Sequence, residues 1–298
     1  MQSRLSFRLL REAEGRPLEV VDFDGTEPDV LGDPLMSWEA RPGNPFARRI
    51  YRREGGGFAI WHDAMGWFLV DEERPSIAVP PSEDELRREE RIWGLPAAVC
   101  IDAGDDLALH GATVDVGGSA VVFCAPGGHG KTTLAAAFLR AGHRVLADDM
   151  SCCRLAPEPS VLPGPAILRI RNDVYSQLEL AGAEPVLRDD EKVHLMLTAA
   201  ARGSGEPVPI RAIVFVRDTS LQAVEGRPAI SEVAAADSLA NLWTVSFTLP
   251  TVERRQRTFE KAAALAGRVR MWEMYRPSSF EGLPGTVDLV TSICSGGD

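Results

Sequence analysis

Residues 110–149 read HGATVDVGGSAVVFCAPGGHGKTTLAAAFLRAGHRVLADD, and the rest of the fold is arranged around this stretch. An apolar run at 120–124 precedes the glycine-rich segment APGGHGKT at 125–132. A helical pattern follows and can end at Gly142, a natural C-cap. One face of that helix is apolar at i, i+3, i+4 and i+7, through Leu134, Ala137, Phe138 and Ala141. The stretch therefore predicts a strand, a tight loop and a helix, in that order.

The loop at 125–132 follows the pattern G-x-x-x-x-G-K-[ST], which holds the phosphates of a nucleotide. Its glycines let the backbone aim several N–H groups at the phosphates, and the start of the helix adds partial positive charge. Lys131 is expected to reach the outer phosphates and the Thr132 hydroxyl to take a magnesium ion. Ala125 replaces the first glycine, a mild change that adds one methyl group. The predicted nucleotide-binding residues are Gly127, Gly128, His129, Gly130, Lys131, Thr132 and Thr133.

A second short apolar run, at 145–147, ends in Asp148 and Asp149. Two carboxylates at a strand end beside a phosphate loop suit magnesium binding and proton abstraction. The alternative interpretation is a glycine-rich surface turn followed by an ordinary pair of aspartates. The order of strand, loop, helix and strand favours the nucleotide site, since the loop pattern alone is short enough to arise by chance.

These residues resemble the catalytic core of bacterial HPr kinase/phosphorylase, a family that phosphorylates a serine of the histidine-containing phosphocarrier protein. The resemblance runs through the whole of 110–149, and it also extends to shorter relatives associated with lasso-peptide biosynthesis, which phosphorylate the C-terminal serine of a precursor peptide. It implies an α/β fold with a P-loop kinase core of the HPr kinase type. The segments that carry it are His110-Gly111, Val114-Asp115-Val116, the phosphate loop, 140–144 and 146–149.

The resemblance also implies roles for individual residues. Asp149 corresponds to the general base at the reacting hydroxyl, Asp148 lies at or near the metal, and His110 positions or assists the base. Arg169 and Arg171 fall where the family keeps an arginine, and strand alternation would send both to one face. The predicted cofactors are ATP and Mg²⁺, and the family suggests a homo-oligomer. The predicted catalytic residues are Asp149, His110, Lys131, Arg169 and Arg171, and the predicted metal ligands are Thr132 and Asp148.

One departure narrows the expected reaction. The family follows its aspartate pair with a Glu-x-Arg-Gly segment tied to phosphate handling and to the reverse, phosphorolytic reaction. The comparable stretch here, 163–172, keeps arginines but lacks both the acid and the glycine. We therefore expect neither phosphorolysis nor the phosphocarrier protein as substrate.

Composition limits the partners. The 298 residues are 45% hydrophobic, enough for a sizeable core, and the formal net charge is −11. That charge argues against nucleic-acid binding and against an anionic membrane surface. No apolar stretch is long enough to span a membrane, and the first residues do not resemble a signal peptide. We therefore expect a cytoplasmic protein. The five cysteines lack zinc-ligand spacing and are expected to be core residues.

Residues 1–100 are expected to form a β-rich N-terminal domain that ends in a helix, and 101–298 the kinase domain. The patterns predict strands at 5–10 and 18–23, a loop through residue 47, and a meander of three strands from 48 to 70. Ser82 and Glu85 have the spacing of a capping box that opens a helix toward Trp93.

The chain after Asp149 shows weaker patterns. They predict strands at 150–155, 211–216 and 269–275, and helices at 172–180, 232–243, 252–266 and 287–294. Residues 181–209 are expected to be loop, with 203–207 mobile over the site. The charges at 253–257 are expected to be a solvated helix face, with a phosphate contact as the alternative.

The predicted function is an ATP-dependent kinase that transfers the γ-phosphoryl group to a serine or similar hydroxyl. The first choice of acceptor is the C-terminal serine of a lasso-type precursor peptide, and the second is a small hydroxylated metabolite. A nucleotide-dependent regulatory ATPase is the competing class, although no Asn-Lys-x-Asp guanine motif is present. A degenerate scaffold is disfavoured because Lys131, Thr132, Asp148 and Asp149 are all retained.

Overall fold

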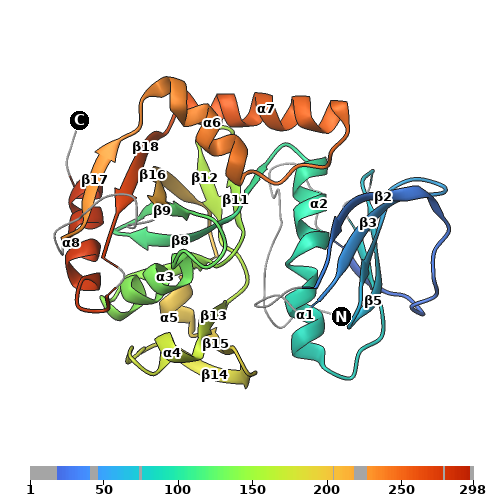
Figure 1. Ribbon diagram of the computed structural model, residues 1–298, viewed down its shortest axis with the longest axis horizontal. Helices are drawn as coiled ribbons and strands as arrows, with labels where there is room; N and C mark the ends of the chain where they lie inside the picture. Colours follow the sequence, from blue (N-terminus) through green and yellow to red (C-terminus); the bar gives the residue numbers. More distant parts are fainter. Residues whose placement is uncertain are drawn as a thin grey trace. The chain divides into compact units, whose positions relative to one another are not determined.

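The computed structural model describes residues 19–40, 46–73, 76–203, 205–217, 227–277 and 279–295. The chain is mixed α/β and divides into two compact units (Figure 1). The first unit combines Met1–Asp105 with Phe247–Thr258, and the second combines Asp106–Ser246 with Phe259–Asp298. The single boundary expected near residue 100 therefore does not account for residues 247–258, which belong to the first unit. No helix within the described residues is long and apolar enough to cross a membrane.

The first unit contains a six-stranded sheet in the order β1-β6-β5-β4-β3-β2. Its strands are antiparallel except for β1 and β6, which run parallel. The predicted meander is confirmed as β3, β4 and β5, and Ile60 and Val70 are buried in its core. The elements are β1 (Glu19–Asp22), β2 (Val30–Trp38), β3 (Arg48–Arg53), β4 (Phe58–His62), β5 (Gly66–Asp71), β6 (Ser76–Val79), α1 (Glu85–Ile92) and α2 (Leu95–Ala103).

Two expectations for this unit are wrong. The loop expected before residue 47 contains β2, whose pairing with β3 shifts register between Leu31 and Met36. Gly32 lies inside that irregular part with a φ of +64°, so an edge strand accommodates the turn-forming residues in a bulge. Helix α1 is capped by Asp84, whose carboxylate accepts from the Arg87 N–H at 2.9 Å, and not by Ser82. The strand expected at 5–10 lies outside the described residues.

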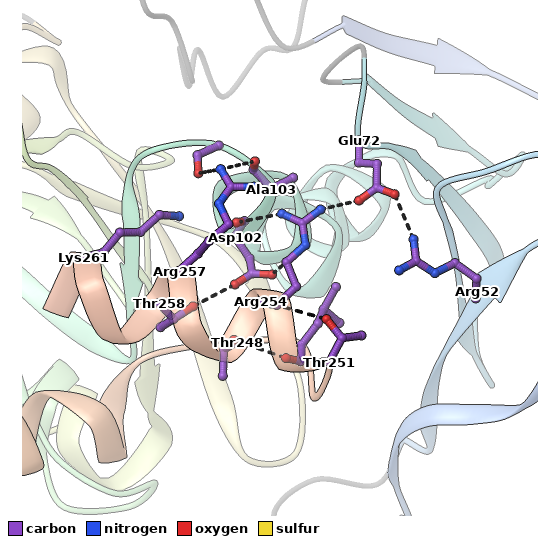
Figure 2. A network of polar contacts seen from close by, with 12 residues as sticks. Arg52, Glu72, Asp102, Ala103, Thr248, Thr251, Arg254, Arg257, Thr258 and Lys261 are labelled. Carbon is purple, nitrogen blue, oxygen red and sulfur yellow. Dashed lines mark hydrogen bonds and ion pairs between the residues drawn. The ribbon is translucent and has the colours of Figure 1, made fainter.

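Helix α7 (Val252–Ala266) matches its predicted limits. Its charged residues Glu253, Arg255 and Arg257 are exposed, as expected, but Arg254 is not. Arg254 is only 11% exposed at its side chain, pairs with Glu72, and donates to the Asp102 carbonyl at 3.2 Å (Figure 2). Arg52 meets the other oxygen of Glu72 at 2.8 Å, and Thr258 donates to Asp102 at 3.2 Å. This network ties residues 247–258 to the rest of the first unit.

The second unit is built on a nine-stranded sheet in which β10, β8, β9 and β16 lie side by side in that order. β9, β16 and β18 run parallel, so their carboxyl ends meet at one edge. The strands are β7 (Leu107–Leu109), β8 (Gly111–Val116), β9 (Ser119–Cys124), β10 (Arg144–Ala147), β11 (Ser151–Arg154), β12 (Ser160–Leu162), β16 (Val208–Arg217), β17 (Ala229–Glu232) and β18 (Arg270–Tyr275).

Helices cover both faces of this sheet. α3 (Lys131–Arg140) and α8 (Leu283–Ser295) share one apolar cluster, in which Phe123 and Phe138 pack with ring centroids 5.4 Å apart. α6 (Ala235–Val245) and the end of α7 pack in a second cluster on the other face, through Leu242 and Leu265. The strands and helices predicted between 120 and 155 and after 210 are confirmed. The helix expected from 232 begins at Ala235, because residues 229–232 pair with β18 as β17.

A three-stranded sheet, β13-β15-β14, occupies residues that were largely expected to be loop. β13 is Ile167–Arg171, β14 is Ala183–Arg188 and β15 is Lys192–Leu197. The helix expected at 172–180 ends early, as α4 (Asn172–Tyr175), and α5 (Ala199–Arg202) follows β15. Val193, Leu195 and Leu197 alternate inward, which specifies β15 in a region rich in loop-forming residues. The mobile segment expected at 203–207 includes Ser204, which lies outside the described residues.

The cysteines are all free thiols. Cys100, Cys124, Cys152 and Cys153 are buried and Cys294 is half-buried, so the expectation of core residues is confirmed for the first four.

Candidate active site

The glycine-rich loop joins the carboxyl end of β9 to the first residue of α3. Gly128 and Gly130 have φ angles of +82° and +80°, a region that favours glycine. Among the described residues the one non-glycine residue with positive φ is Asp149, so Ala125 occupies an ordinary conformation. The alanine at the first position of the pattern therefore imposes no backbone strain on the loop.

Lys131 is buried inside the loop that it follows. Its Nζ donates to the Ala125 carbonyl at 2.8 Å and to the Pro126 carbonyl at 3.0 Å, and lies 3.0 Å from His110 Nε2. Burial lowers the pKa of Lys131, while the charge of Asp149 opposes that shift. The side chain is thus held at the glycine-rich loop and is linked to a second predicted site residue.

Thr132 and Asp148 are joined directly, because the Thr132 hydroxyl donates to Asp148 Oδ1 at 2.7 Å. The Arg169 backbone N–H donates to the other oxygen, Oδ2, at 3.0 Å. Asp148 is only 8% exposed, and burial raises its pKa, with Arg169 opposing. A buried carboxylate in this position suits a cation that would offset its charge.

A magnesium ion fits this pair as a ligand set. Within the described residues no group of three or more His, Cys, Asp or Glu side chains is placed to hold a metal. Mg²⁺ does not need such a cage, since it is commonly bound by one or two protein oxygens together with phosphates and water. Thr132 and Asp148 supply those oxygens next to the loop.

Asp149 lies at the centre of a cationic group. Its φ is +70°, Arg169 Nη2 donates to its Oδ2 at 2.7 Å, and His110 Nδ1 is 3.6 Å from its Oδ1. Desolvation raises its pKa, but Arg169, His110, Lys192 and Lys131 outweigh that effect and hold the pKa below its usual value. Left-handed backbone at a non-glycine residue costs free energy and is concentrated at functional sites, and here the carboxylate of that residue meets Arg169 and His110.

The partners of His110 define its tautomer. His110 follows β7 directly, and its backbone N–H donates to the Val245 carbonyl at 2.7 Å. Its Nδ1 is 3.1 Å from the Asp149 carbonyl oxygen, which can only accept, so Nδ1 carries the hydrogen. Nε2 then accepts from the Lys131 ammonium. Burial lowers the pKa of His110, against the pull of Asp149, and so favours this neutral form.

The structure therefore brings together His110, Lys131, Asp149 and Arg169, but not Arg171. The Arg171 side chain is 69% exposed and donates from Nε and Nη2 to Asp173, at 2.9 Å each. Strand alternation correctly placed both arginines on one face of β13, but the pairing with Asp173 holds Arg171 away from the aspartate pair.

Two other predicted residues complete the loop. His129 is on the loop, with Nδ1 3.0 Å from the Gly127 carbonyl oxygen, and Thr133 is in the first turn of α3.

Arg276 is a site residue that the patterns did not reveal. It directly follows β18, and a Cβ built on Gly130 would overlap its Nη2, so the guanidinium lies against the phosphate loop. Nη1 donates to the Pro277 carbonyl at 3.0 Å, whereas the buried Nε has no hydrogen-bond partner. Burial lowers its pKa. Its position directly after β18 could have suggested this place, because β18, β16 and β9 run parallel and their carboxyl ends meet at one edge of the sheet.

Comparisons with known proteins add little to this geometry. No family profile matches the chain, and no curated protein matches its sequence. The structure of the Hpr(Ser) kinase/phosphatase from Coxiella burnetii is similar over 63% of this chain and 93% of its own, at 8% identity and a TM-score of 0.33. A likeness at that level supports neither a substrate nor a residue role, and both must come from the site itself.

Proposed function

We propose that this protein is an ATP-dependent kinase that transfers the γ-phosphoryl group to a serine or similar hydroxyl. One observation carries the proposal: a continuous hydrogen-bonded set joins the glycine-rich loop, through Lys131 and His110, to Asp149 and Arg169. Phosphoryl transfer requires a phosphate cradle, a metal and a group that accepts the hydroxyl proton. This set would provide the cradle and the proton acceptor, and the adjoining pair of Thr132 and Asp148 would provide ligands for the metal.

The donor side is formed by the loop and its cations. With a nucleotide bound, loop N–H groups and the start of α3 would face the phosphates, and Lys131 would exchange its carbonyl partners for phosphate oxygens. Arg276 brings a second positive charge to the same loop, and a phosphate oxygen would satisfy its buried Nε. Thr132 and Asp148 would hold a magnesium ion, which offsets charge on the phosphates when bound.

The acceptor side is formed by Asp149 and its partners. The hydroxyl oxygen attacks the γ-phosphorus, the bond from phosphorus to the β,γ-bridging oxygen breaks, and ADP departs. The hydroxyl proton passes to the Asp149 carboxylate and from there to solvent. Arg169 fixes the carboxylate, and the neutral His110 ring holds the Asp149 backbone in place.

Our first choice of acceptor is the C-terminal serine of a ribosomal precursor peptide of the lasso type. That choice follows from the sequence resemblance of residues 110–149, together with the missing Glu-x-Arg-Gly segment. A small hydroxylated metabolite is the second choice.

The test is transfer of label from γ-labelled MgATP to separate pools of serine-ended peptides, metabolites and proteins. We expect label in the peptide pool with the wild type and none with Asp149→Asn, which should still bind nucleotide. Label in the metabolite pool alone would replace the peptide with a small acceptor. Phosphate release at the same rate in both proteins, with no labelled acceptor, would contradict the kinase and favour a regulatory ATPase.

A further inference from the structure

Lys192 is a cation of the small sheet to which the site described above gives no role. β13 pairs with β15 so that Arg169 lies opposite His194 and Arg171 lies opposite Lys192. Directly opposite residues share a face of a sheet, and so do alternate residues of one strand. The intervening residue Val193 is buried in the apolar cluster that contains α3. Lys192 therefore lies with Arg169 on the other face, away from that cluster.

The backbone of Lys192 is fixed, while the charge of its side chain is available. Asp189 Oδ1 accepts from the Lys192 N–H at 2.7 Å, and the Asp189 N–H donates to the Lys192 carbonyl at 2.9 Å. The other oxygen of Asp189 lies 3.3 Å from His194 Nε2. Lys192 is half-buried, and across the described part of the chain no carboxylate forms an ion pair with its Nζ. The ammonium can therefore pair with a ligand.

The ammonium lies on the side of the site from which the acceptor must come. Arg169 Nη2 donates to Asp149 Oδ2 at 2.7 Å, and Lys192 is the diagonal neighbour of Arg169 across the strand pair. Diagonal neighbours are within reach of long side chains. Burial raises the pKa of Asp149, but Arg169 and Lys192 are among the cations that hold this pKa below its usual value, so the charge of Lys192 acts on the carboxylate. The Asp149 side chain is 55% exposed, and an acceptor can approach it from solvent.

The phosphates alone do not account for this cation. The glycine-rich loop already has Lys131 on its carbonyls and Arg276 against Gly130. Lys131 begins α3 and Arg276 follows β18, whereas Lys192 belongs to the small sheet β13-β15-β14. A neutral acceptor hydroxyl needs no cation either. A carboxylate beside that hydroxyl would be repelled by Asp149 and by the γ-phosphate, and a nearby ammonium offsets this repulsion.

We propose that Lys192 binds a carboxylate of the acceptor, attached to the carbon next to the one that bears the reacting hydroxyl. Its ammonium donates to the carboxylate in a charge-assisted hydrogen bond. The proposal rests on the proposed function, because it takes Asp149 as the proton acceptor of the same reaction. Two sources share this chemistry, a serine at the carboxyl end of a peptide and a free β-hydroxy acid. An internal serine has a neutral peptide carbonyl at that position, so Lys192 selects against it.

The experiment compares acceptors that differ only in this charge. A pool of serine-ended peptides is made once with a free C-terminal carboxylate and once with a carboxamide, and small β-hydroxy acids are tested beside their amides. Initial rates of label transfer from γ-labelled MgATP, at limiting acceptor, give kcat/KM for the wild type, Lys192→Gln and Arg140→Gln. Arg140→Gln is the matched control, since it removes an exposed cation at the end of α3 that is opposite to the loop.

We expect the wild type and the control to prefer the acids over the amides by about tenfold, and Lys192→Gln to lose this preference because transfer to the acids falls. Label in the peptide acids identifies a chain end as the source of the carboxylate, and label in the small acids alone identifies a free hydroxy acid. Calorimetry should give Lys192→Gln the same Kd for MgATP as the wild type, which also checks that the variant retains its fold.

The outcomes that would overturn the inference are distinguishable from failure of the proposed function. If the wild type labels acids and amides equally, or labels only acceptors without a carboxylate, the kinase stands and the role of Lys192 does not. An equal loss with acids and amides in Lys192→Gln would instead assign Lys192 to the phosphates or to Asp149. If the wild type labels no acceptor in any pool, the proposed function fails together with the inference.

Discussion

The burial of His62 predicts a pH-dependent change in the free energy of unfolding, and its magnitude can be calculated. This residue of β4 is 4% exposed, its Nδ1 accepts from the Ala64 N–H at 3.2 Å, and its Nε2 is buried without a hydrogen-bond partner. Burial lowers its pKa from 6.5 to about 4, and the charge of Arg91 adds to the effect. The unfolded chain therefore binds a proton at a higher pH than the folded protein does.

The sign and size of the effect follow by linkage. The contribution of His62 to the free energy of unfolding is fully present above the unfolded pKa and is lost as the pH falls toward the folded pKa. Between pH 8 and pH 5 the loss is about 2 kcal/mol, and at pH 4 it reaches about 3 kcal/mol. Other groups titrate over the same range, so the effect is isolated by comparison with a variant that does not titrate there.

The assay is urea unfolding followed by tryptophan fluorescence at pH 8 and pH 5, for the wild type and for His62→Gln. Glutamine can accept the Ala64 hydrogen bond through its carbonyl oxygen but carries no ionisable group. We expect the variant to lose about 2 kcal/mol less than the wild type between the two pH values. Equal losses in the two proteins would refute the assignment of a buried, neutral histidine.

Three further substitutions have defined outcomes. Gly130→Ala strains a φ of +80° and overlaps the guanidinium of Arg276, so calorimetry should show MgATP affinity lowered more than tenfold, whereas Gly285→Ala on α8, whose Cβ would make only ordinary contacts, should change it little. Thr132→Val should raise the magnesium concentration needed for half-maximal transfer about tenfold, and an unchanged requirement would argue against a metal at this hydroxyl. Arg254→Met should lower the free energy of unfolding by about 2–3 kcal/mol, because it removes a largely buried cation that pairs with both Glu72 and Asp102. Arg255→Met, on the exposed side of α7, is its control and should be nearly neutral.

The part of the site that local sequence could predict is the part that is continuous in the chain. The loop, the start of α3 and the aspartate pair follow one another within residues 125–149, so chain order and residue type suffice to place them. Alternation puts Arg169 and Arg171 on one face of β13 and does not separate them. Arg169 meets Asp149 through a tertiary contact, whereas Arg171 pairs with Asp173, two residues along the chain.

The rest depends on contacts between distant segments. Arg276 reaches Gly130 because β18 lies parallel to β16, a pairing that no local pattern encodes. β2 was missed because its bulge carries turn-forming residues, and β14 because its residues are largely exposed. Residues 247–258 belong to the first unit through the contacts of Arg254. The residues around Arg254 in the sequence have the pattern of an ordinary charged helix, which does not predict those contacts.

The most direct test of the central claim is calorimetric binding of MgATP to the wild type and to Lys131→Met, a variant that keeps most of the apolar stem and removes the charge. We expect micromolar to millimolar binding by the wild type and at least a tenfold loss in the variant, with the thermal unfolding of both proteins checked in parallel. Equal affinity in two folded proteins would contradict it, because the loop at 125–132 would then not be where the phosphates bind.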